Sequence, residues 1–227
     1  HESAKSVKLT PPLFSCILNP SIMHLYYLGG TAVKIQTKDN AGDVNIVIDP
    51  YKPDDKGGSF PTTLAPQIAL FSRGQEGSIT LQQNPFIIDT PGEYEVRGVM
   101  IYGIPTKDGI LFQLSVENMN VLHAGALKNL PDEKTLERLS SADVLLVPVG
   151  GHETLDAKKA ATLVTELEPR AVIPIAFRSG NNDPQQAPVE PFLKEIGHEN
   201  GAPQPKAIIV ESKLPEEDMD IIVLASA

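Results

Sequence analysis

A change of pattern near residue 130 is the sequence feature that most limits how this chain can fold. Between Met23 and His123, short β-rich runs alternate with turn residues. Beyond residue 130, buried apolar runs alternate with helical segments. A strand-rich half followed by strand–helix alternation is typical of two packed sheets with helices outside. The sequence therefore predicts an α/β protein of the α+β kind.

The first half contains the expected strands of a β-rich core. They are short apolar or alternating runs between turn residues, at 24–28, 32–37, 44–49, 67–71, 86–88, 94–103, 110–116 and 119–123. The pair Pro91-Gly92 has the composition of the centre of a type II turn. We therefore expect a tight turn that leads into a long hairpin over the run 94–103.

The second half contains the expected helices, at 131–139, 155–168 and 189–196, between strands at 144–149, 172–177, 206–211 and 220–224. Residues 155–168 give the clearest helix, because their apolar residues recur on one face at 3.6-residue spacing. Thr154 is the expected N-cap, Asp156 suits the positive end of the helix, and Pro169 ends it.

Length and composition favour one compact domain. A chain of 227 residues with 41% hydrophobic residues can bury a substantial core. We expect residues 23–227 to form a single domain, since 25–29 has the pattern of a first strand. Residues 1–22 are expected to be an N-terminal extension that is disordered or not native to the protein.

Charge and cysteine content limit the classes of partner. The formal net charge is −10, and an acidic chain without a basic stripe repels phosphate backbones and anionic membranes. We therefore expect neither a nucleic-acid nor a membrane partner. No run of about 18 apolar residues is present. Cys16 is the only cysteine, which excludes an intrachain disulfide and suits a cytoplasmic location.

Five motifs, in this order and at this spacing, resemble those of a known family. They are Tyr27-Leu28-Gly29-Gly30, Ile46-Val47-Ile48-Asp49-Pro50, Thr90-Pro91-Gly92-Glu93-Tyr94-Glu95-Val96, Val147-Pro148-Val149-Gly150-Gly151 and Val172-Ile173-Pro174-Ile175-Ala176. The chain resembles the metallo-β-lactamase superfamily, most closely its bacterial branch of small metal-dependent hydrolases related to ascorbate-phosphate lactonase. The resemblance implies a four-layer αββα sandwich with its site on loops at one edge of the sheets.

Active members of that family hold zinc with a His-x-His-x-Asp-His loop and later ligands, and the metal lowers the pKa of a bound water. Here the loop reads Arg73-Gly74-Gln75-Glu76-Gly77-Ser78. The resemblance implies that every expected ligand position is vacated, namely Gly30, Arg73, Gln75, Gly77, Ser78, Ala126 and Ala176. A chain that lacks all of these ligands is expected to hold no metal cofactor.

The expected function is therefore a catalytically inactive homologue, without catalytic residues, that is retained for binding or assembly. The alternative is a metal-dependent hydrolase of a small ester, lactone or phosphate-bearing substrate that uses non-standard ligands. A third interpretation is a subunit, for example of a homo-oligomer, whose partner supplies the activity. Zinc content distinguishes the first two interpretations, and oligomeric state tests the third.

A vestigial pocket is expected from six residues near the former site: Asp49, Arg73, Gln75, Ser78, His123 and His152. The guanidinium of Arg73 could hold a small anionic ligand. Alternatively, Arg73 pairs with Glu76 or Asp49. Asp49 is also interpretable as a carboxylate that accepts backbone N–H groups, and His123 as a packed structural histidine.

The turn Gly150 to Thr154 leads into the expected helix 155–168. Free backbone N–H groups at such a helix start could receive an anion. The same geometry is common in proteins that bind nothing there, so both interpretations stay open.

Overall fold

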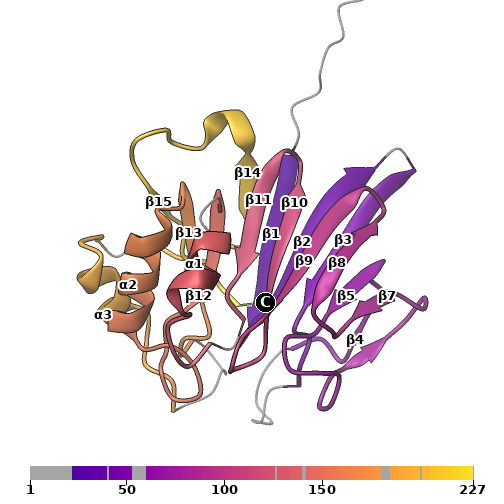
Figure 1. Ribbon diagram of the computed structural model, residues 1–227, viewed down its shortest axis with the longest axis horizontal. Helices are drawn as coiled ribbons and strands as arrows, with labels where there is room; N and C mark the ends of the chain where they lie inside the picture. The colour runs from indigo at the N-terminus through magenta and orange to yellow at the C-terminus, as the bar shows by residue number, and fades with distance from the viewer. Residues whose placement is uncertain are drawn as a thin grey trace, which may run out of the picture.

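Two β-sheets packed face to face form the centre of the molecule (Figure 1). The computed structural model describes residues 22–39, 41–52, 60–125, 127–139, 142–179, 185–199 and 201–226. Most of the expected extension at 1–22 lies outside these residues, as does Ala126. Ile22 itself belongs to the first strand rather than to the extension.

In the described chain, the first sheet has six strands in the order β14-β1-β2-β3-β5-β7. Their bounds are β1 Ile22–Gly29, β2 Ala32–Asp39, β3 Gly42–Ile48, β5 Ile68–Leu70, β7 Phe86–Ile88 and β14 Ala207–Val210. Strands β14, β1, β2 and β3 are antiparallel neighbours, whereas β3, β5 and β7 run parallel. Alternate residues such as Leu25, Ile35 and Ile46 are fully buried, so one face of the sheet points into the core.

The second sheet has seven strands among the described residues, in the order β15-β13-β12-β11-β10-β9-β8. Their bounds are β8 Gly92–Val96, β9 Val99–Pro105, β10 Ile110–Val116, β11 Met119–His123, β12 Val144–Pro148, β13 Ala171–Ile175 and β15 Asp220–Ile221. Strands β11, β12, β13 and β15 are parallel. Every residue of β12 and β13 is buried, as expected for strands covered on both faces.

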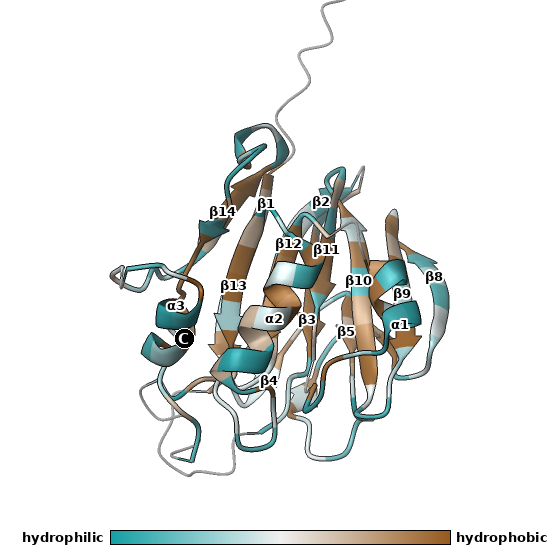
Figure 2. Cartoon of the chain, turned by 60° about the vertical axis from the view of Figure 1, so that its left-hand side comes forward, coloured by the Kyte–Doolittle hydropathy of each residue, from teal (hydrophilic) through white to brown (hydrophobic). Residues whose placement is uncertain are grey.

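The helices of the described chain lie outside the second sheet (Figures 1 and 2). They are α1 Glu133–Leu139, α2 Ala157–Leu167 and α3 Glu190–Glu195, and a short 3₁₀ turn, η1, spans Glu211–Lys213. Helix α2 buries one apolar stripe that includes Leu163 and Leu167. The predicted α/β sandwich of two sheets is confirmed, and the described helices cover the outer face of the second sheet.

The expected hairpin over 94–103 is present, because Arg97 (φ 55°) and Gly98 (φ 74°) turn the chain between β8 and β9. Three other details differ from the sequence predictions. Gly92 does not form a type II turn, since it is already paired in β8 with a φ of 154°. The N-cap of α2 is Asp156 rather than Thr154. A small parallel sheet of β4 Thr63–Leu64 and β6 Thr80–Leu81 was not predicted, since two-residue strands leave no periodic signal.

Candidate functional site

Asp49 lies at the end of β3, where the resemblance places the site, and it is fully buried. Its Oδ1 accepts a hydrogen bond from the backbone N–H of Ser72 at 2.7 Å. Its Oδ2 accepts one from the Ser72 hydroxyl, also at 2.7 Å. The interpretation of Asp49 as a strand-end carboxylate that accepts a backbone N–H is confirmed. Asp49 thereby fixes the start of the loop that follows β5.

His123 ends β11 and is also fully buried. Its Nδ1 accepts a hydrogen bond from the backbone N–H of Gly125 at 3.1 Å, so the ring proton is on Nε2, which donates to the carbonyl of Thr31 at 2.9 Å. Burial lowers the pKa of His123, although the Asp49 carboxylate and the Thr31 hydrogen bond oppose that change. The histidine is therefore neutral, and both ring nitrogens join β11 to its neighbours. This agrees with the structural interpretation of His123.

Tyr51 organises the loop that replaces the ligand loop of active relatives. Its hydroxyl donates to the carbonyl of Gly74 at 2.9 Å and accepts from the backbone N–H of Arg73 at 3.0 Å. The Arg73 guanidinium lies 5.0 Å from the centre of the Tyr51 ring. Burial, helped by the nearby Asp49 charge, raises the pKa of Tyr51 to about 12. Sequence reasoning missed Tyr51, although its position directly after Asp49-Pro50 was a usable signal.

The predicted pairing of Arg73 with Glu76 or Asp49 is wrong. Within the described residues, Arg73 forms no ion pair with either carboxylate and lies on the Tyr51 ring instead. Asp49 is inaccessible to it, because that carboxylate is buried against Ser72.

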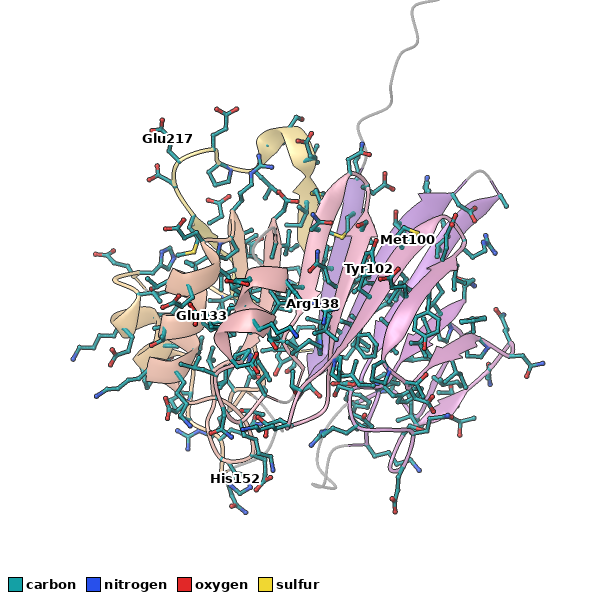
Figure 3. The ribbon with its side chains drawn as sticks, in the orientation of Figure 1. Met100, Tyr102, Glu133, Arg138, His152 and Glu217 are labelled. Atoms are coloured by element: carbon teal, nitrogen blue, oxygen red, sulfur yellow. The ribbon has the colours of Figure 1, made fainter. Side chains whose placement is uncertain are left out.

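The remaining predicted site residues do not converge on one open pocket. Gln75 donates a hydrogen bond to Asp89 at 2.7 Å, and Ser78 forms an isolated antiparallel β-bridge with Tyr51. His152 is exposed in the loop between β12 and α2 and points outward at the lower end of the molecule (Figure 3). The hollow at this edge leaves no room for a water molecule; it is lined by Ser72, Thr106, Asp108, Gly109, Ile110, Leu111, Ala124 and Leu127.

Close backbone approaches keep this edge shut. The Ile110 N–H donates to the carbonyl of Ser72 at 2.9 Å, and a Cβ at Gly109 would lie 2.5 Å from that same oxygen. On the far side, the Ala176 N–H donates to the carbonyl of Gly30 at 2.7 Å. Only a glycine permits the first of these approaches, so the tight closure is encoded in the sequence.

Hydrogen bonds and ion pairs also join the surrounding loops. One carboxylate oxygen of Asp108 accepts the backbone N–H groups of Lys128 and Asn129, each at 3.0 Å. The Lys128 ammonium pairs with Glu153 in the loop after β12. Lys159 of α2 donates to the carbonyl of Lys128 at 3.0 Å. Three loops and one helix are thus linked to one another.

The described positions where the resemblance predicts ligands hold no imidazole or carboxylate group; they are Gly30, Arg73, Gln75, Gly77, Ser78 and Ala176. The seventh position, Ala126, lies outside the described residues. No group of three His, Cys, Asp or Glu side chains comes close enough to hold a metal ion within the part of the chain that the structure describes.

The start of α2 already has its acceptor. Asp156 Oδ1 accepts the backbone N–H of Lys159 at 2.9 Å, and the Gly151 N–H donates to the carbonyl of Leu155. A carboxylate at the N-cap meets the need that an anion would otherwise fill. The arrangement thus favours the interpretation of this turn as purely structural.

Comparison with known proteins defines the class to which this fold and edge belong. The model of the family described as "Beta-lactamase superfamily domain" matches residues 24–176, more than half of the chain. The chain therefore belongs to the metallo-β-lactamase superfamily.

Its sequence relatives carry the name UPF0173 metal-dependent hydrolase. One from Pyrococcus abyssi is 31% identical over 142 residues, 57% of this chain and 59% of the relative. One from Thermococcus onnurineus is 31% identical, and the match covers 52% of its length. One from Methanopyrus kandleri is 24% identical over 216 residues, 77% of this chain and 91% of the relative. The chain thus spans little more than half the length of the first two relatives. These three come from archaea, so they do not tie the chain to the bacterial branch.

Solved structures agree on the fold. A protein from Thermotoga maritima, assigned to the zinc-dependent hydrolases of this superfamily, has a TM-score of 0.74 at 25% identity, with 89% of this chain and 99% of that chain covered. A metallo hydrolase from Ignicoccus hospitalis has a TM-score of 0.60 at 18% identity and shows the fold alone. Among the described helices of this chain, none has the length and apolar character needed to span a membrane.

Proposed function

We propose that this protein is a non-hydrolytic member of the superfamily, which keeps the fold for binding rather than for metal-dependent catalysis. One observation carries the proposal. At the sheet edge where the family resemblance places the metal site, the two side chains best suited to bind a metal already accept hydrogen bonds from the protein. Both carboxylate oxygens of Asp49 accept hydrogen bonds from Ser72, and the only unprotonated ring nitrogen of His123 accepts from Gly125. A catalytic zinc site needs about three such ligands with free lone pairs and an open position for water.

The neighbouring residues do not fit a zinc ion either. The described ligand positions hold glycine, alanine, serine, glutamine or arginine, and the hollow between the loops has no room for water. A hydrolytic water could therefore be neither bound nor activated at this edge without movement of Ser72 and Gly109. We also propose a cytoplasmic location. The single cysteine cannot form an intrachain disulfide, and proteins without disulfides suit a reducing compartment.

Metal content tests the proposal directly. The protein would be produced in medium with zinc and manganese, passed through a desalting column, and analysed by elemental mass spectrometry. We expect far less than one equivalent of either metal, and the same content in the D49N and H123Q variants. About one or two equivalents in the wild type, with a loss in either variant, would instead support a hydrolase with non-standard ligands.

A further inference from the structure

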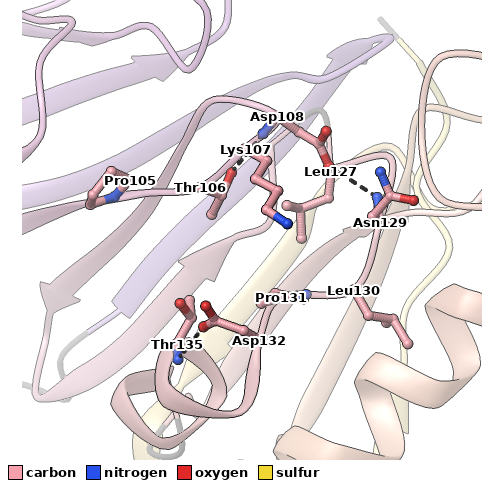
Figure 4. A pocket seen from close by; sticks show the side chains of 10 residues that line it. All are labelled: Pro105, Thr106, Lys107, Asp108, Leu127, Asn129, Leu130, Pro131, Asp132 and Thr135. Carbon is pink, nitrogen blue, oxygen red and sulfur yellow. Dashed lines mark hydrogen bonds between the residues drawn. The ribbon is translucent and has the colours of Figure 1, made fainter.

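A cavity of about 420 Å³ opens beside the closed hollow, on the helix side of the second sheet. It lies between the loop after β9, the loop after β11 and the start of α1 (Figure 4). Its lining residues are Pro105, Thr106, Lys107, Asp108, Leu127, Asn129, Leu130, Pro131, Asp132 and Thr135. Its volume is in the range of small-molecule sites. This cavity, unlike the family edge, has room for a ligand.

Part of the cavity wall is apolar and fixed. Leu127 is buried, and the backbone just after it is held by Asp108, which accepts the N–H groups of Lys128 and Asn129. Leu130 is 39% exposed and lines the cavity, so its side chain is accessible to a ligand. These side chains offer an apolar contact surface to whatever enters.

Three charged side chains line the cavity, and the Asp108 carboxylate is engaged by backbone N–H groups, which leaves Lys107 and Asp132 to face a ligand. The ammonium of Lys107 points into the cavity toward Leu127 and Pro131 (Figure 4), and within the described residues it forms no ion pair. The hydroxyl and backbone N–H of Thr135 hold the pKa of Asp132 below its usual value, and the Lys107 charge adds to this. Asp132 is therefore ionised at neutral pH. Its Oδ1 accepts the Thr135 N–H at 2.9 Å.

From this arrangement we infer that the cavity binds a zwitterionic α-amino acid with an apolar side chain. The ligand carboxylate pairs with Lys107, the ligand ammonium pairs with Asp132, and the side chain packs against Leu127 and Leu130. A simple anion in the cavity would be repelled by the like charge of Asp132. A simple cation would be repelled by the like charge of Lys107. This inference rests on the proposed binding role, and it places the ligand away from the family's hydrolytic edge.

Calorimetric titration with L-leucine tests the inference. We expect saturable binding that weakens by roughly tenfold or more in K107Q and in D132N, because each removes one charge-assisted contact. Asparagine is a good N-cap, so D132N preserves the start of α1. K158Q and D218N remove the same charges outside the cavity and should bind as the wild type does. Circular dichroism would verify that each variant is folded.

Ligand analogues test the same inference on the unchanged protein. N-acetyl-leucine lacks the ammonium and leucinamide lacks the carboxylate, so both should bind at least tenfold more weakly than leucine. Equal binding of all three compounds, or no leucine binding at millimolar concentration, would overturn the inference. Wild-type affinity in both cavity variants would also overturn it. The metal content of the same preparation tests the proposed function separately. A protein that holds no zinc and does not bind leucine would contradict only the amino-acid site.

Discussion

At the scale of single residues, the edge where the family resemblance places the metal site is defined by polar groups that bind one another. Asp49 holds Ser72, and His123 holds Thr31 and Gly125. Buried polar groups are costly unless they are hydrogen-bonded, so these contacts make the edge stable without a ligand.

His123 gives the protein a defined pH dependence. The pKa of His123 in the folded protein lies below the ordinary value of 6.5. As the pH falls below 6.5, the unfolded chain therefore binds a proton at this histidine more readily than the folded chain does. The unfolding free energy should therefore fall as the pH drops below about 6.5, by up to about 1.4 kcal/mol per pH unit from this one group. Urea unfolding at pH 7.5, 6.5 and 5.5 measures the effect.

The matched variants for this prediction are H123Q and H198Q. The glutamine at 123 does not titrate, so that variant should lose the part of the pH slope that belongs to His123. His198 lies beyond α3 on the surface, and H198Q should keep the wild-type slope. Equal slopes in H123Q and the wild type would show that another group causes the dependence.

The residue scale also shows where sequence reasoning failed. Acceptance of a backbone N–H by Asp49 was one of two interpretations open from the sequence, because a strand-end carboxylate can take nearby N–H groups. A packed role was expected for His123, because histidine is often semi-buried. The partner of Arg73 could not be predicted, because the contact depends on the tertiary position of the Tyr51 ring next to the loop that carries Arg73. Likewise, Gln75 meets Asp89 from the next strand end, a contact that local pattern cannot reveal.

At the scale of elements, the start of α2 was predicted within two residues but capped by the wrong residue. The hydroxyl of Thr154 donates to the carbonyl of Gly151, so it closes the preceding turn instead of capping the helix. Asp156 takes the cap because its side chain reaches the N–H of Lys159. Hydrophobic periodicity locates a helix better than it locates the cap.

The cap assignment leads to a stability prediction. D156A should lower the unfolding free energy by about 1 kcal/mol, because the Lys159 N–H loses its acceptor. D156N keeps an acceptor at the same place and should cost only a fraction of that. Thermal or urea unfolding of both variants provides the measurement, and equal losses would show that charge rather than capping matters.

At the scale of the whole molecule, the two sheets form one continuous hydrophobic core that includes residues from β1 to Leu224. The architecture was predictable, since buried strands and one amphipathic helix are strong sequence signals. The shortest elements were not, because two-residue strands such as β4 depend on distant partners.

If the protein is the non-hydrolytic, metal-free member that we propose, metals should not change its stability. A ligand that binds only the folded state raises the unfolding temperature with its concentration. We therefore expect the same unfolding temperature, within about 1 °C, with a chelator and with excess zinc. Scanning calorimetry of one preparation under both conditions gives the comparison. A zinc-dependent rise that disappears in H123Q would contradict the proposal.

The pairing of β14 with β1 has a consequence for synthesis. Residues 22–25 align with residues 207–210, so β1 is covered by a strand that is synthesised after every other described strand of the first sheet. Until residue 210 leaves the ribosome, β1 presents an uncovered row of backbone donors and acceptors, which is a template for pairing with other chains. Growing chains that have not yet made β14 should therefore need a chaperone, or rapid synthesis of β14, to avoid aggregation.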